Sequence, residues 1–404
     1  MKNNLKIVAG LDIGNGYVKG TTKGLNDQLI SIDLPSSTAY VMNPVDVPVA
    51  PEKIPSTIDD IFNQMDLSFD TPLLKGIDGL GRRLFGKRGL NSGHSIRKFT
   101  IDAHVSKAEQ PLSYVLILGC VAGTALKDYY ATNKALPTET LRVESNMGIA
   151  LPITEYKKYR ESFANKFTSY THMVTFHNFE QPVRMEIVFT DVQVLAEGAS
   201  AQYAIVSKGV NLMNLMLNDI RSRGVALDGI VADDILQAEN TIEIDIGEGT
   251  VNFPVFTNGV FNTDASETLS KGWGTVLENS LAPLAAANLT YDNRKALAED
   301  LQKTPTALNR AKLDRVRTIV NGEAQNFAKE LVDAFSRVMS SSTQVVYVYG
   351  GGATPMKELI YNMLQQAVIP YVGEYDFPIL YLDSTYSRYL NKQGLFEIAS
   401  SFAK

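Results

Sequence analysis

A glycine-containing motif, D-I-G-x-G, occurs twice in the chain. The first copy, LDIGNGYVKG, spans residues 11–20, and the second, IDIGEGTVNF, spans residues 244–253. In each copy an apolar run ends at an aspartate, two glycines follow one residue apart, and another apolar run comes next. This order predicts a strand, a tight turn and a returning strand. A chain that contains the unit twice is expected to have two related halves.

The two glycines of each turn suggest why the unit is repeated. Glycine lets a backbone approach a ligand closely and adopt positive φ, so that successive N–H groups can point at one anion. One such turn is equally compatible with an ordinary hairpin, whereas two copies in facing halves could hold a polyphosphate from both sides. Asp12 and Asp245 would then approach a divalent metal through its water shell, because Mg²⁺ keeps most of its waters. Lys19 would add a point charge toward the phosphates.

A third glycine cluster lies near the C-terminus. The segment VYVYGGGATPMKEL, residues 346–359, places three glycines between a β-rich run and a helical pattern. Such a turn lets a flat ligand such as a nucleoside lie against the backbone, although a strand-to-helix turn alone would look the same.

Length and composition limit the fold class. A chain of 404 residues is longer than one core usually serves, so two domains or lobes are expected. Strand and helix patterns alternate along it, which indicates an α/β fold. The apolar segment 113–130 predicts a buried helix, and residues 33–60, with five prolines, read as a loop-rich peripheral stretch.

Charge and cysteine usage limit the partners and the compartment. A net charge of −6 argues against a surface that neutralises nucleic-acid phosphates, so no direct DNA binding is expected. The single cysteine, Cys120, excludes a disulfide framework and a thiolate metal site. The apolar run around it is shorter than the roughly 20 residues that span a bilayer, and the N-terminus lacks the pattern of a signal peptide. We expect a cytoplasmic protein without a membrane span.

With these three motifs in this order, the sequence resembles the actin-like ATPase superfamily, and within it the bacterial plasmid-segregation actins of the ParM type. LDIGNGYVKG is similar to the first phosphate loop of that superfamily, IDIGEGTVNF to the second, and VYGGGATPMKEL to the adenosine loop. Residues 191–204 and 387–399 are similar to the two helices that connect the lobes. The resemblance is poorest over about 33–105.

The resemblance implies an α/β, actin-like two-lobed fold, with duplicated ribonuclease-H-like domains around a nucleotide cleft. The first lobe would span 1–190 with a peripheral insertion at about 33–105, and the second lobe would span 191–383. A C-terminal helix, 384–404, would return to the first lobe. ATP and Mg²⁺ are the implied cofactors.

The resemblance also implies site residues. Asp12 and Asp245 would serve the metal, and Glu197 and Asp245 would be catalytic. Glu197 matches the acid that helps to orient the attacking water; alternatively, it interacts as a helix N-terminal acid with the macrodipole. The implied cofactor-binding residues are Asp12, Gly14, Asn15, Gly16, Tyr17 and Lys19 in the first loop, Gly247, Glu248, Gly249 and Thr250 in the second, Glu323 and Asn326 on a helix, and Gly350, Gly351, Gly352 and Ala353 in the nucleoside loop.

The implied function is ATP-dependent filament formation, in which hydrolysis of ATP to ADP and phosphate controls the polymer. Its partners would be further copies of the chain and an adaptor protein bound to centromere-like DNA, so that plasmid or other DNA is segregated. Two other functions stay open: a small-molecule kinase of the same fold and a non-polymerising ATPase switch. No residue stands out as a base aimed at a substrate hydroxyl.

Other polar residues receive plainer interpretations. His94, His104, His172 and His177 lack the spacing of metal ligands. The basic segment GRRLFGKRGL, residues 81–90, is either a solvated face or a protruding subunit contact in a filament. Trp273 is expected to pack rather than to stack on a ligand.

Overall fold

The computed structural model describes residues 4–100, 105–382, 384–387 and 389–403. The chain divides into two compact units. Unit 1 comprises Met1–Ser207 together with Asn391–Lys404, and unit 2 comprises Lys208–Leu390.

Unit 1 is built on a ten-stranded sheet of order β3-β2-β1-β8-β10-β9-β5-β6-β4-β7. β1, β2 and β3 form an antiparallel meander, whereas β8 is parallel to β1 and β10 is parallel to β8. The strands are β1 (Asn4–Ile13), β2 (Tyr17–Lys23), β3 (Leu29–Pro35), β4 (Ser37–Val41), β5 (Asp66–Asp70), β6 (Arg82–Phe85), β7 (Ser95–Lys98), β8 (Leu141–Leu151), β9 (Thr171–Phe176) and β10 (Val183–Ala196).

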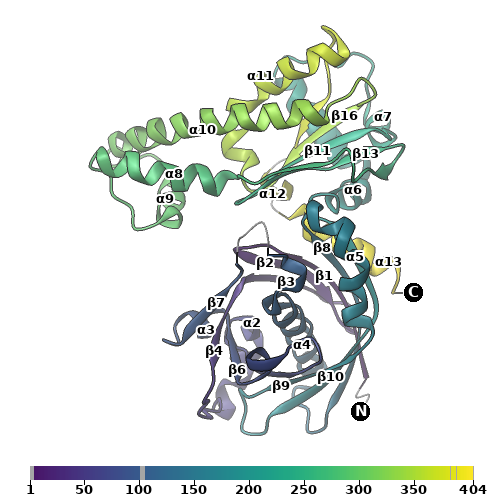
Figure 1. The fold of residues 1–404 in the computed structure, drawn as a ribbon, viewed down its shortest axis with the longest axis vertical. Coiled ribbons are helices and arrows are strands. Elements are labelled where there is room, and N and C mark those ends of the chain that lie inside the picture. Colours follow the sequence, from purple (N-terminus) through teal and green to yellow (C-terminus); the bar gives the residue numbers. More distant parts are fainter. Residues whose placement is uncertain (1–3, 101–104, 383, 388, 404) are drawn as a thin grey trace. The chain divides into compact units, whose positions relative to one another are not determined.

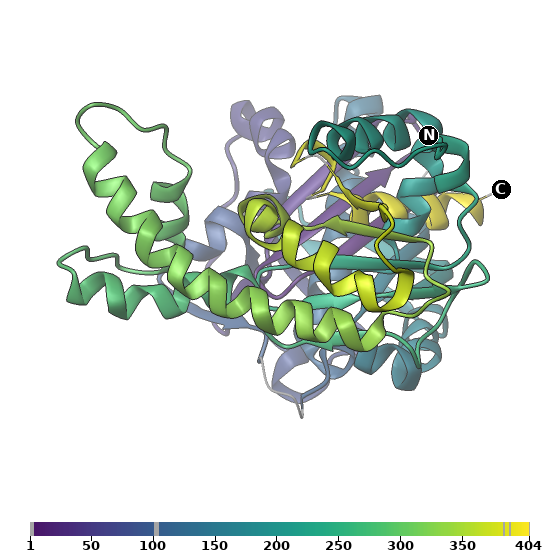
Figure 2. The same ribbon diagram turned by 90° about the horizontal axis from the view of Figure 1, so that it is seen from above.

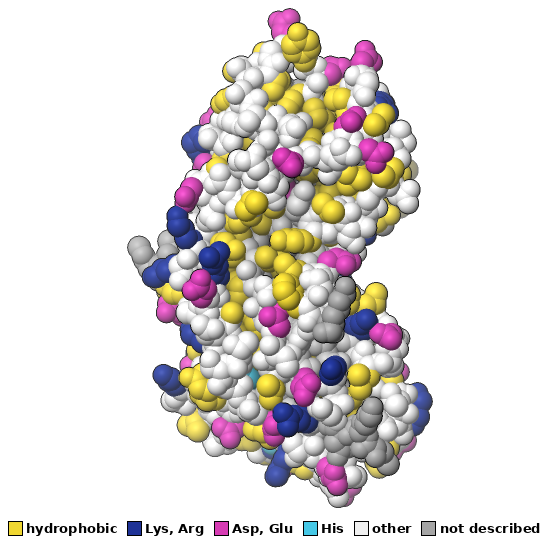
Figure 3. Space-filling model, turned by 90° about the vertical axis from the view of Figure 1, so that its right-hand side faces the viewer, with side chains coloured by type: hydrophobic (Ala, Val, Ile, Leu, Met, Phe, Trp, Pro, Cys, Tyr) yellow, Lys and Arg dark blue, Asp and Glu magenta, His cyan; other side chains and the backbone are white. Residues whose placement is uncertain are grey.

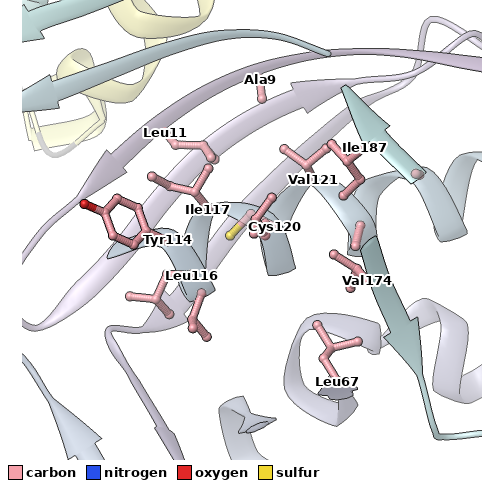
Figure 4. Packing of buried hydrophobic residues seen from close by; sticks show 14 of the residues in the cluster. Ala9, Leu11, Leu67, Tyr114, Leu116, Ile117, Cys120, Val121, Val174 and Ile187 are labelled. Carbon is pink, nitrogen blue, oxygen red and sulfur yellow. The ribbon is translucent and has the colours of Figure 1, made fainter. Parts of the chain in front are cut away.

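The sheet curves around one central helix, α4 (Pro111–Asn133), as Figure 1 shows. Alternate residues of β1 point into this core, among them Ala9 and Leu11. In the close-up of Figure 4 they lie beside Ile117, Cys120 and other apolar side chains of α4. Close packing of this kind is the main source of stability in a domain.

The predicted buried helix is confirmed, but it is longer than the apolar run suggested. α4 has 23 residues and is long and apolar enough to cross a membrane by length and composition alone. However, 94% of its apolar window is buried inside the protein, as expected of a core helix. Burial also raises the pKa of the Cys120 thiol to about 12, so this cysteine is an inert core residue.

The loop-rich interpretation of residues 33–60 is only partly right. Pro51 and Pro55 lie in the first turns of short helices, where the missing N–H of proline costs nothing. From Ser37 onward the chain also adds β4, β5, β6 and β7 to the sheet. The remaining helices of unit 1 are η1 (Pro51–Lys53), α1 (Ile54–Asp59), α2 (Ile61–Gln64), η2 (Gly76–Gly79), α3 (Gly86–Leu90), η3 (Lys107–Glu109) and α5 (Ile153–Thr168).

The last helix, α13 (Leu390–Ser401), packs onto β1 and β8 of unit 1. Gly10 and Gly148 are register partners across these two strands. A Cβ atom on Gly10 would lie 2.2 Å from the backbone nitrogen of Phe396, and one on Gly148 would lie 2.1 Å from the carbonyl oxygen of Leu395. Two opposed glycines therefore form the bare patch of sheet on which the helix rests.

Unit 2 repeats the core of unit 1. Its strands follow the order β15-β12-β11-β16-β17, with β12 and β15 antiparallel and β16 and β17 parallel, as in β3-β2-β1-β8-β10. β13 and β14 are added beside the first half of β11. The strands are β11 (Thr241–Ile246), β12 (Val251–Phe253), β13 (Val255–Thr257), β14 (Val260–Phe261), β15 (Glu267–Leu269), β16 (Val345–Tyr349) and β17 (Ile379–Tyr381).

Helices cover this second sheet. The longest, α10, packs against α8 and α11, and Figure 2 shows its length in unit 2. α6 crosses the boundary between the units in the sequence and is interrupted at Gly209, whose φ is 60°. The helices are α6 (Ala201–Ser222), α7 (Ala232–Leu236), α8 (Trp273–Ala286), α9 (Arg294–Leu301), α10 (Arg310–Val338), α11 (Ala353–Val372) and α12 (Ser384–Ser387).

The duplicated α/β architecture predicted from the repeated motif is thus confirmed. In both units the motif occupies the same place, the turn between the central strand and its antiparallel neighbour.

Candidate functional site: two glycine turns and an acidic residue

The first glycine turn joins β1 to β2. Gly14 N–H donates to the carbonyl of Tyr17 at 3.0 Å and closes the turn. Behind it, the Ser36 hydroxyl donates to the Gly14 carbonyl at 2.6 Å, and the Ser36 N–H donates to the Gly16 carbonyl at 3.0 Å. Asn15, Gly16 and Tyr17 are exposed, so the turn is held from one side and accessible from the other.

The second glycine turn, between β11 and β12, has the same geometry. Gly247 N–H donates to the carbonyl of Thr250 at 2.9 Å. The carbonyls of Gly247 and Glu248 accept hydrogen bonds from Trp273 N–H at 3.0 Å and Gly274 N–H at 2.8 Å, at the start of α8. The equivalent carbonyls of Gly14 and Gly247 therefore both accept a hydrogen bond, from the Ser36 hydroxyl in unit 1 and from Trp273 N–H in unit 2.

The glycine cluster after β16 lies against the second turn. Gly352 N–H donates to the Ile246 carbonyl at 2.8 Å. Gly350 has φ of +100°, and a Cβ atom there would lie 2.6 Å from Oδ1 of Asp245. Only glycine combines this backbone conformation with so close an approach. Unit 2 thus brings together Asp245, the second turn and the predicted nucleoside loop, with Ala353 as the first residue of α11.

The two aspartates differ in their surroundings. Asp12 is half-buried at the end of β1 and lies opposite Lys19 on β2. Burial raises its pKa, and Glu197 adds to this effect, whereas the positive charges of Lys19 and Lys107 lower it. Asp245 lies opposite Asn252 and is 7% exposed.

Glu197 lies just after β10, near the first turn. Its N–H donates to the Leu151 carbonyl at 2.7 Å, which continues the pairing of β10 with β8. The sequence suggested a helix starting near Glu197, but α6 begins only at Ala201. Helix-dipole effects fade within the first turn, so the dipole interpretation of Glu197 loses its basis.

The partner of Glu197 was missed by sequence reasoning. Nζ of Lys107 donates to Oε1 of Glu197 at 2.6 Å, and the Lys107 side chain is only 8% exposed. Nothing near Lys107 in the sequence marks it, because the pairing depends on a contact between distant segments.

Comparisons with known proteins agree with this fold. No curated protein matches the sequence. Residues 10–199 match a family model described as the N-terminal domain of actin-like proteins. Bacillus thuringiensis ParM with ADP is similar in structure, with 15% identity, 100% of both chains covered and a TM-score of 0.60. The archaeal actin homologue Ta0583 has 14% identity, with 98% of this chain and 99% of that chain covered and a TM-score of 0.59.

The chain has the actin-like fold. A third similar structure, a pCBH ParM described as a non-polymerisable quadruple mutant, has 14% identity, with 99% of this chain and 100% of that chain covered and a TM-score of 0.55. The Bacillus thuringiensis ParM is also found in similar structures with ATP and with AMPPNP.

The two helical residues predicted to bind the nucleoside, Glu323 and Asn326, lie on α10. Glu323 is half-buried and Asn326 is exposed, and a spacing of three places them on one side of the helix. A further contact that sequence reasoning missed joins the second turn to α9, where Arg294 forms an ion pair with Glu248 at 2.8 Å.

The residues of the two glycine turns suit Mg²⁺ only if phosphate oxygens supply part of its coordination. Among the residues that the structure describes, no group of three or more histidine, cysteine, aspartate or glutamate side chains forms a metal cluster. Each glycine turn offers one aspartate, Asp12 or Asp245. Mg²⁺ is usually held by one or two carboxylates together with waters and substrate phosphates, so the single aspartate at either turn is compatible with it.

Two of the described histidines, His172 and His177, make structural contacts within unit 1. His172 is buried between Thr71 and the Phe167 carbonyl, and His177 contacts Ser68. His94 is exposed, and His104 lies outside the described residues. Trp273 is half-buried at the start of α8, with its backbone bound to the second turn.

The basic segment does not form the predicted solvated face, and its first part does not protrude. Arg82 and Arg83 belong to β6 and are 8% and 5% exposed. Arg82 pairs with Asp46 and Asp66, and Arg88 also pairs with Asp66. The carboxylates that neutralise this cluster come from distant segments, which is why the sequence alone made it look free.

Replacing Arg82 by glutamate is therefore expected to destabilise unit 1. The change removes the cation beside Asp46 and one of the two beside Asp66, and it adds a third carboxylate to a largely buried site. We expect a loss of about 3–5 kcal/mol in the free energy of unfolding. Urea unfolding followed by circular dichroism measures it. Lys87→Glu, at an exposed position of α3, is the control. Unchanged stability with altered self-association would instead favour a subunit contact.

Proposed function

We propose that this chain is an ATPase that assembles into filaments and uses hydrolysis of ATP to control their turnover. The observation that carries the proposal is the duplicated turn: in both units a glycine turn follows a central strand that ends in an aspartate, and its backbone is tied down from behind. One such turn could be an ordinary hairpin turn, but two equivalent turns favour a role in binding the phosphates of one nucleotide.

In this proposal each residue has a defined role. The N–H groups of the two turns, together with Lys19, bind phosphate oxygens, because fixed donors and a point charge stabilise anions. The glycine cluster 350–352 and the α10 residues Glu323 and Asn326 bind the nucleoside. Mg²⁺, when bound near Asp12 and Asp245, would neutralise charge on the phosphates.

Glu197 supplies the chemistry that the turns lack. Its carboxylate orients a water molecule and accepts a proton from it. The water oxygen forms a bond to the γ-phosphorus, and the bond from that phosphorus to the β–γ bridging oxygen breaks, which yields ADP and phosphate. The protein forms no covalent bond to the phosphate in this step, so its contribution to the rate comes from positioning the water and stabilising the charge on the transferred group.

The filament part of the proposal rests on the fold together with the pCBH ParM description, in which a quadruple mutant is called non-polymerisable. A head-to-tail contact that does not close into a ring gives an open filament. We extend the proposal to DNA segregation in the cytoplasm, through an adaptor bound to centromere-like DNA. An indirect link to DNA suits a chain of net charge −6, and Figure 3 shows acidic and basic side chains interspersed on the face that it draws.

Assembly is tested by light scattering, pelleting and negative-stain microscopy of the full chain. With ATP and magnesium we expect polymer above a threshold concentration, and the threshold should be higher with ADP, since nucleotide acts only by favouring one arrangement that binds its neighbour better. A chain that stays monomeric under these conditions and phosphorylates a small hydroxyl compound would instead be a kinase.

A further inference from the structure

The turn that carries Lys107 is fixed from several sides. The N–H groups of Lys107 and Ala108 donate to the carboxylate of Glu155 on α5 at 2.9 and 3.1 Å, and the Ser106 hydroxyl donates to the same carboxylate. The Ser113 hydroxyl of α4 donates to the Lys107 carbonyl at 2.7 Å. The backbone of Lys107 is therefore held in place before its side chain makes any contact.

The side chain of Lys107 is then directed at one carboxylate. Its ammonium lies 2.6 Å from Oε1 of Glu197, and the two side chains are 8% and 18% exposed. Lysine is seldom buried without a partner. Asp12 interacts electrostatically with both charges, so the first glycine turn, Glu197 and Lys107 form one charged cluster within unit 1.

We propose that Lys107 is a positioning residue for Glu197: it holds Oε1 and leaves Oε2 to receive the attacking water. The inference rests on the proposed ATPase function and adds to it a residue outside the three motifs. A carboxylate on a flexible side chain populates several rotamers, whereas a short charge-assisted hydrogen bond selects one. Lys107 acts through Glu197 and does not touch the nucleotide.

Replacing Lys107 by methionine separates positioning from binding. We expect kcat for ATP hydrolysis to fall by about 10- to 100-fold, the scale of a small misplacement of a reacting group. The Kd for a fluorescent ATP analogue with magnesium should change by less than about 3-fold, because in this proposal Lys107 does not contact the nucleotide. Loss of a nucleotide contact worth about 1.4 kcal/mol would raise the Kd about tenfold. Lys87→Met, at an exposed position of unit 1, is the matched control.

A double-mutant comparison tests whether the effect passes through Glu197. In a Glu197→Gln background, Lys107→Met should lower kcat no further, since residues that act as a unit are not additive. The double variant also removes both charges, so it avoids the isolated buried carboxylate that Lys107→Met creates. Lys107→Gln keeps a hydrogen-bond donor and should retain a kcat between those of wild type and Lys107→Met. Thermal unfolding confirms that each variant is folded.

The outcomes separate the inference from the proposed function. Wild-type kcat in a folded Lys107→Met or Lys107→Gln variant would overturn the positioning role alone, as would additive losses in the double variant. A Kd that rises as much as kcat/KM falls would make Lys107 a nucleotide ligand and also overturn it. Wild-type protein that binds ATP but does not hydrolyse it would refute the ATPase and, with it, the inference.

Discussion

Replacing Glu197 by glutamine is expected to slow phosphate release from ATP by about 10²- to 10⁴-fold, the usual contribution of a positioned general base. Glutamine keeps the shape of the side chain but cannot accept the proton. ATP binding should survive, because the residues assigned to phosphate and nucleoside lie in the glycine turns, the glycine cluster and α10. Filaments formed with ATP should consequently persist, since the step that raises the assembly threshold is lost.

Two measurements follow this variant. Phosphate release is compared with the wild type in a coupled assay, and polymer lifetime is followed by pelleting after dilution. Because Lys107 loses its charged partner, thermal unfolding must first show that unit 1 is intact. Folded Glu197→Gln protein whose phosphate release matches the wild type would remove Glu197 from the mechanism.

Replacing Asp12 or Asp245 by alanine is expected to lower ATP hydrolysis by about 10²- to 10³-fold, the scale for losing one preorganised electrostatic group. The two variants should be similarly impaired, although the aspartates belong to different units, because the proposal needs both turns for one nucleotide. ATP affinity should fall as well if each carboxylate supports the metal and phosphates.

Isothermal titration with ATP and magnesium, together with the phosphate-release assay, measures both losses. Asp70→Ala in unit 1 and Asp292→Ala in unit 2, both at exposed positions, are the controls. If only one of the two site variants is impaired while both are folded, the duplicated site would be wrong and a single functional turn would remain.

Local patterns predicted the elements around the site well. The strand–turn–strand order at Asp12 and Asp245, the buried helix around Cys120 and the strand-to-helix turn at 350–352 all depend on residue types close together in the sequence. Glycines at fixed positions and continuous apolar runs leave few alternative conformations.

Features that depend on distant segments could not be predicted. Arg82 looked exposed because Asp46 and Asp66 are separated from it in the sequence and meet it only in the folded sheet. Lys107 carried no local signal for the same reason. The GWG pattern at 272–274 did indicate one such contact, that between α8 and the second turn. Glycines on both sides of Trp273, the first residue of α8, allow the N-terminus of this helix to approach the turn closely.

The docking of α13 on Gly10 and Gly148 has a consequence for synthesis. Unit 1 is made from residues 1–207 and 391–404, so the ribosome synthesises all of unit 2 before the helix that completes unit 1. At about 5–20 residues per second, β8 is complete roughly 12–50 s before its covering helix, and β1 is complete earlier still. During that time the sheet lacks Leu395 and Ala399, the side chains of α13 that are fully buried in the folded protein. Until α13 has been made, the nascent chain therefore presents a bare patch of sheet at Gly10 and Gly148.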